Sequence, residues 1–223
     1  LENLMMDVYE PTGDTETDRP VVVMLHTGSF LPAIANGQPT GDKSDFAIVE
    51  ACKNYARRGY VAVAVNYRLG WNPALPTEAE RASSLMKAAY RGIQDVKAAI
   101  RFFRMDYENG NTYGIDTSRI IICGQGTGGW IATCLNSVDK LSEIQLPKFL
   151  DPVTALPLID TAVMGDWFGY GGNPAYNTPS NVGYSSEHDM VLNMGGAIGD
   201  ISWLEAGDIP LCSVHGTNDG TVL

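Results

Sequence analysis

Short apolar runs alternate along the chain with longer segments whose apolar residues recur every three or four positions. The runs are continuous, which is typical of strands buried on both faces of a parallel sheet. We predict strands at residues 21–25, 60–65, 120–123, 190–194 and 210–214. The helical spacing predicts helices over about 45–58, 78–104 and 128–135, and a short one near Trp203. This alternation predicts an α/β protein with a mostly parallel sheet flanked by helices.

Residues 136–188 interrupt the alternation. They are rich in Pro, Gly, Asn, Tyr and Trp and have no strong period. We interpret them as a lid-like or cap-like insert within a single domain of residues 1–223, because long irregular segments often form lids or binding loops. The aromatic residues Trp167, Phe168 and Tyr170 are predicted to pack within this lid. In an alternative hypothesis, these residues line a groove that binds an acyl chain, an aromatic ester or a sugar.

The charge of the chain limits its partners. A formal net charge of −11 argues against nucleic acid and anionic membranes, which both need a basic surface. The sequence contains no apolar run of the ~20 residues that span a membrane. The negative charge is compatible with a small ester or acyl-type ligand and with a protein partner. Low lysine content with abundant Gly, Asn, Thr and Tyr favours a secreted or periplasmic protein.

The cysteines are widely spaced, at Cys52, Cys123, Cys134 and Cys212, and form no C-x-x-C pair. We therefore expect no zinc site, and we assign no other metal and no cofactor. Cys123 and Cys212 lie in apolar strand-like runs, so we predict that both thiols are buried and inert.

Residues 124–129, GQGTGG, fit two motifs. The first is a dinucleotide-binding loop that uses Gly124, Gly126 and Gly129. That motif needs a second strand ending in an acidic residue ~20 positions later. Asp139 and Glu143 end no apolar strand, and two strands already precede the glycines. The dinucleotide interpretation is therefore the weaker one.

The second motif is the sharp strand-to-helix turn that presents a catalytic serine, G-x-S-x-G. Four stretches of the chain together resemble the α/β-hydrolase family, in particular its esterase/lipase, carboxylesterase-like branch. The four stretches are MDVYEP with VVVMLHTGSF, GYVAVAVNYRLG, RGIQDVKAAIRFFR with YGIDTSRIIICGQGTGG, and IPLCSVHGTNDGTV. The family has H-G-G-x-F where the first stretch has HTGSF. The resemblance follows the family's order and covers nearly the whole chain outside the insert.

This resemblance implies roles for particular residues. Gly126 occupies the nucleophile position between Gly124 and Gly128, and Asp219 occupies the position of the triad acid, with Asp200 a weaker candidate. The resemblance also implies an oxyanion loop that contains His26, with backbone N–H donors from Gly28, Ser29 and Thr127.

Two triad positions depart from the family. Gly126 carries no hydroxyl, and an acyl-enzyme cannot form without a nucleophile. The family's catalytic histidine follows the acid, and none of His26, His188 and His215 matches that position. We expect that histidine, with the last strand and helix of the fold, beyond Leu223. Two function classes follow: an ester hydrolase that is inactive or works in an altered way, and a non-catalytic binding or assembly protein on a hydrolase fold.

Overall fold

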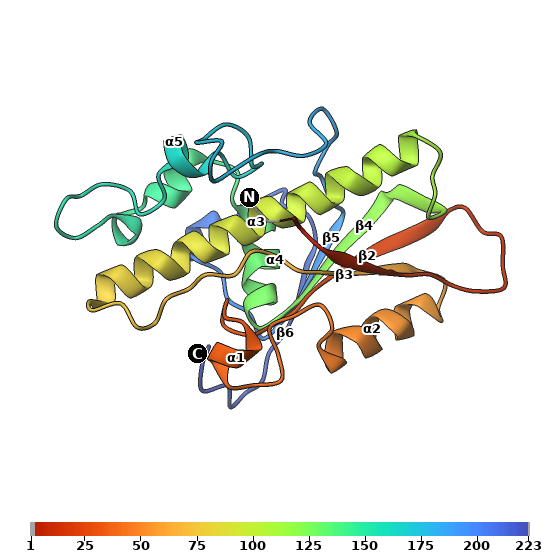
Figure 1. Cartoon of the computed structure of the whole chain (residues 1–223), viewed down its shortest axis with the longest axis horizontal. Coiled ribbons are helices and arrows are strands. Elements are labelled where there is room, and N and C mark those ends of the chain that lie inside the picture. Colours follow the sequence, from red (N-terminus) through yellow and green to blue (C-terminus); the bar gives the residue numbers. More distant parts are fainter. Residues whose placement is uncertain (1–2, 223) are drawn as a thin grey trace.

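The computed structural model describes residues 3–222, and its centre is a six-stranded sheet (Figure 1). The strand order is β1-β3-β2-β4-β5-β6, and every pair is parallel except β1 with β3. The strands are β1 (Met6–Tyr9), β2 (Arg19–Leu25), β3 (Val61–Val65), β4 (Ile115–Gln125), β5 (Met190–Met194) and β6 (Leu211–Val214). The mostly parallel sheet that the sequence predicts is confirmed.

Helices cover both faces of the sheet, which explains why the central strands are apolar throughout. Val21, Val23 and Leu25 of β2 point into one core, toward α3 and α4. Val22 and Met24 point into a second core on the side of α2. Figure 1 shows α2 and α3 on opposite sides of the sheet. A strand buried on both faces gains stability from every side chain, at roughly 25 cal/mol per Å² of apolar surface.

The helices are α1 (Ala33–Asn36), α2 (Phe46–Ala56), α3 (Glu78–Glu108), α4 (Thr127–Ser137) and α5 (Thr161–Met164). The longest, α3, begins at a capping box in which Thr77 and Glu80 satisfy each other's backbone N–H groups. It continues four residues beyond the predicted end, to Glu108. No helix within residues 3–222 combines the length and apolar character needed to cross a membrane.

The insert contains only short elements beyond the end of α4. These are the 3-10 helices η1 (Leu141–Gln145) and η2 (Pro147–Phe149), and α5. A third 3-10 helix, η3 (Ile201–Trp203), lies at the short helix predicted near Trp203. The insert is fixed to α3 by side chains of that helix: Tyr90 Oη donates to the Gly165 carbonyl at 3.0 Å, and Gln94 Nε2 donates to the Asp166 carbonyl at 2.8 Å.

The prediction for Cys212 is wrong. All four residues of β6 are exposed, because β6 is the last strand of the described sheet and pairs only with β5. Cys212 is therefore exposed, whereas Cys52, Cys123 and Cys134 are buried, and all four are free thiols. The predicted burial of Cys123 is confirmed. This burial raises the pKa of Cys123 to about 12, which disfavours the reactive thiolate.

Candidate functional site

The candidate site forms where β2, β4, β5 and β6 end. These strands are parallel, so the segments after them all emerge at the same edge of the sheet. Gly126 follows β4, and its N–H donates to the carbonyl of Met194, the last residue of β5, at 2.9 Å. Asp219 lies beyond the end of β6, and a Cβ built on Gly195 would lie 3.9 Å from its Oδ2. The edge thus brings the two predicted triad positions to the same side of the sheet, after β4 and after β6, with β5 between these strands.

The turn at Gly126 has the backbone conformation of a sharp strand-to-helix connection, which glycine adopts without strain. Its φ of 53° and ψ of −116° lie in a region that residues with side chains rarely adopt. The neighbouring glycines allow β4 and α4 to approach closely. A Cβ on Gly124 would overlap the Gly128 carbonyl, and a Cβ on Gly128 would lie 2.7 Å from the His26 carbonyl oxygen. The geometry is that of a tight turn that presents its apex, Gly126, with no side chain there.

The loop after β2 is held rigidly beside this turn. The side-chain amide of Asn36 donates to the carbonyls of Gly28 at 3.2 Å and Thr40 at 2.7 Å. Gly28 is packed so closely on Gly41 that a Cβ would lie 2.6 Å from the Gly41 Cα. Ser29 has a positive φ of 57° and is exposed. Among residues 3–222, no protein acceptor takes the backbone N–H of Gly28 or Ser29.

His26 is a buried and neutral member of this loop. Its side chain stacks on Tyr67 with ring centroids 4.3 Å apart, and Nδ1 lies 2.6 Å from the Thr27 carbonyl oxygen. Burial lowers the pKa of His26 below its usual range. The Tyr67 hydroxyl donates to the His26 carbonyl at 2.7 Å and lies 3.2 Å from Thr127 Oγ1. Tyr67 therefore ties the loop to the start of α4. This role was not predicted, although Tyr67 lies two residues after the predicted strand 60–65.

Asp219 lies in a short turn with His215. Its carboxylate accepts the backbone N–H groups of Thr221 at 2.8 Å and Val222 at 3.0 Å. His215 Nε2 lies 3.4 Å from Asp219 Oδ2. The Val222 and Thr221 N–H groups, with a smaller contribution from His215, lower the pKa of Asp219, so the carboxylate is ionised at neutral pH. The other candidate acid, Asp200, instead caps η3 and pairs with Lys148 at 2.5 Å.

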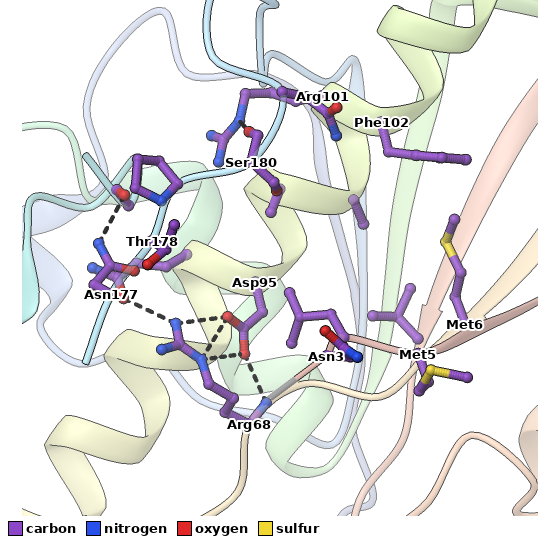
Figure 2. A pocket seen from close by; sticks show the side chains of 18 of the residues that line it. Asn3, Met5, Met6, Arg68, Asp95, Arg101, Phe102, Asn177, Thr178 and Ser180 are labelled. Carbon is purple, nitrogen blue, oxygen red and sulfur yellow. Dashed lines mark hydrogen bonds and ion pairs between the residues drawn. The ribbon is translucent and has the colours of Figure 1, made fainter. Parts of the chain in front are cut away.

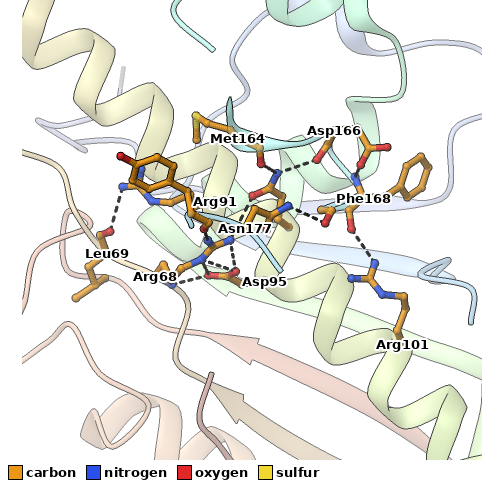
Figure 3. A network of polar contacts seen from close by, with 12 residues as sticks. Arg68, Leu69, Arg91, Asp95, Arg101, Met164, Asp166, Phe168 and Asn177 are labelled. Carbon is orange, nitrogen blue, oxygen red and sulfur yellow. Dashed lines mark hydrogen bonds and ion pairs between the residues drawn. The ribbon is translucent and has the colours of Figure 1, made fainter. Parts of the chain in front are cut away.

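The aromatic residues of the insert lie along α3. The Phe168 ring stacks on Tyr170 with centroids 6.2 Å apart, and it is tilted against Trp167 with centroids 5.8 Å apart. Lys97 Nζ lies 4.3 Å from the centre of the Phe168 ring, and Arg101 lies 5.0 Å from that of Tyr170. Figure 3 shows how Arg101 and its neighbours on α3 reach the backbone of this segment. The described contacts join the aromatic residues to α3 and do not reach Gly126.

A cavity of about 470 Å³ lies between β1, α3 and residues 176–181 (Figure 2). Met5 and Met6 line one side, and the pair of half-buried Arg68 and buried Asp95 lines another. Its lining does not include Gly126, so it is separate from the turn. Residues 3–222 contain no group of three or more His, Cys, Asp or Glu side chains that could hold a metal ion.

Comparisons with known proteins agree with the fold. A sequence model of the BD-FAE family matches residues 6–223. Among solved structures, the chain is similar to a thermophilic esterase of the Planctomycetes species Thermogutta terrifontis. With its propionate-bound form the TM-score is 0.62 at 20% identity, over 99% of this chain and 70% of that chain. With the same esterase phosphorylated by paraoxon, the TM-score is 0.60 at 20% identity, over 99% and 68%. With its butyrate-bound form, the TM-score is 0.61 at 19% identity, over 99% of this chain and 70% of that chain. The predicted α/β-hydrolase fold is confirmed.

Proposed function

The chain belongs to the BD-FAE family and is related to carboxylic-ester hydrolases, and we propose that it binds an ester or acyl group without forming an acyl-enzyme at Gly126. Gly126 is the observation that carries the proposal. It stands at the apex of the turn, where a serine nucleophile would have to stand, and it offers no atom that can attack a carbonyl.

The binding half of the proposal rests on the loop after β2. The N–H groups of Gly28 and Ser29 lie in a loop that Asn36 holds in place, beside the turn and the first residue of α4, Thr127. Free N–H groups that are fixed in advance stabilise a partly negative carbonyl oxygen. This edge of the protein therefore supports recognition of an ester or acyl carbonyl even without a covalent step.

Two measurements test the proposal. Intact mass spectrometry after treatment with a fluorophosphonate and with paraoxon should show no adduct on this protein. The thermophilic esterase that paraoxon phosphorylates serves as the positive control. An adduct mapped to residues 119–135 or to residues 26–31 would overturn the proposal.

The second measurement is saturation-transfer NMR with methyl butyrate and with sodium butyrate. We expect saturation transfer to at least one of the two ligands. We also expect that this ligand changes the backbone amide chemical shift of Gly28 or Ser29 in the protein. If neither ligand binds, the chain has no acyl site at this edge.

A further inference from the structure

The side chain of Thr27 occupies the space beside Gly126, the apex of the turn between β4 and α4. A Cβ built on Gly126 would overlap Thr27 Oγ1 and would lie 2.9 Å from Thr27 Cβ. Rotating the Thr27 side chain about χ1 moves Oγ1 but leaves Cβ in place, so the overlap with a residue 126 side chain is not relieved. A side chain at position 126 therefore needs a shift of the Thr27 side chain and of the backbone of one of the two residues.

The backbone around Thr27 does not let it withdraw. Its carbonyl oxygen lies 2.6 Å from Nδ1 of the buried His26, and the next residue, Gly28, is packed against Gly41. In the pattern that the loop resembles, H-G-G-x-F, position 27 is a glycine. Thr27 thus places a hydroxyl beside the apex of a turn that carries no side chain of its own.

We infer that the Thr27 hydroxyl is the side-chain group that contacts the bound ester or acyl carbonyl, an inference that rests on the proposed function. Thr27 is half-buried, and among residues 3–222 no protein group hydrogen-bonds its Oγ1. It lies one residue from the Gly28 N–H and directly above the Gly126 apex. A hydroxyl can donate to a carbonyl oxygen, which both an ester and a free carboxylate present. Without a base bonded to it, Thr27 acts here as a binding group and specificity determinant.

The test compares Thr27→Val with Thr27→Ser in NMR titrations with methyl butyrate and sodium butyrate. Valine has the shape of threonine without the hydroxyl, whereas serine keeps the hydroxyl. Loss of one hydrogen bond should weaken binding about fivefold in Thr27→Val, and Thr27→Ser should bind within about twofold of wild type. Unchanged amide spectra outside residues 26–31 and 124–130 show that both variants fold.

The outcomes separate the inference from the proposed function. Wild-type binding that Thr27→Val leaves unchanged overturns the Thr27 contact alone. Absence of binding to the wild type overturns the proposed function and the contact together. A fivefold loss with methyl butyrate but not with butyrate assigns the contact to an ester carbonyl, and the reverse assigns it to a carboxylate.

Discussion

The Arg68 guanidinium lies 2.7 Å from the Asp95 carboxylate in a pair that joins the end of β3 to the middle of α3. Asp95 is buried, and it also accepts the backbone N–H of Arg68 at 2.7 Å. The Arg68 guanidinium also donates to Gln94 Oε1 at 3.2 Å and to the Tyr176 carbonyl at 3.3 Å (Figure 3). The pair thus links the sheet, the long helix and the insert.

Replacing Arg68 with methionine should destabilise the protein by about 3–5 kcal/mol, because a buried carboxylate loses its partner. Burial already raises the pKa of Asp95 against the opposing effect of Arg68. An acid whose folded-state pKa is raised loses stability as the pH rises from its unfolded-state value through its folded-state value, so the loss should be larger at neutral pH than below the usual range of aspartate. Urea unfolding measures it. Lys53→Met is the control, since it removes only an exposed ion pair with Glu50 and should leave the stability nearly unchanged. A similar effect of both variants would contradict this account.

His188 should make the protein sensitive to mild acid. Burial, with the neighbouring cations Lys97 and Arg104, lowers the pKa of His188 to about 4. The unfolded chain binds this proton near pH 6.5 and the folded chain only near pH 4, so stability is lost as the pH falls between these values. The loss should amount to at most about 3 kcal/mol, and His188→Gln should remove it. Unfolding free energies measured at pH 7, 6, 5 and 4 test this. Parallel curves for the two proteins would exclude His188 as the cause.

The sequence predicted most of the fold because its signals are local. β5 matches its predicted bounds, and each of the other predicted strands lies where an apolar run was found. The runs of β2 and β3 are buried almost throughout on both faces, so composition alone marks these strands. Cys212 was misjudged because LCSV has the same composition as an internal strand. Its exposure depends on the position of β6 in the sheet, which a local pattern does not encode.

The site was predicted less completely than the fold. The resemblance identified Gly126 and Asp219 by their motifs, but the overlap between positions 27 and 126 is a through-space relationship between loops about a hundred residues apart. The buried charges of α3, such as Lys97 and Arg101, were also missed. They look like a solvated helix face until the aperiodic insert covers them, and periodicity says nothing about where such a segment lies.

Cys212 should be the one thiol that reacts quickly under native conditions. It is exposed, whereas burial raises the pKa of Cys52 and Cys123 to about 12 and that of Cys134 to about 11. Reactivity follows the accessible thiolate, which the buried thiols do not form near pH 8. Maleimide labelling with peptide mapping should modify Cys212 first, and Cys212→Ser should abolish the fast phase. Rapid labelling of Cys123 in the folded protein would contradict the buried position of β4.

The overlap between Thr27 and position 126 predicts strong coupling in a double-mutant cycle. Gly126→Ser should cost about 2–4 kcal/mol, since serine must adopt the strained backbone of the turn and displace Thr27. Thr27→Gly frees that space, so the double variant should recover about 1–3 kcal/mol relative to the sum of the single variants. Gly59→Ser is the matched control. Gly59 also has a positive φ, 92°, but a Cβ there meets nothing within 4 Å, so its effect should add to that of Thr27→Gly without coupling. Equal coupling in both cycles would show that Thr27→Gly loosens the whole fold, and that Thr27 and residue 126 do not compete for one space.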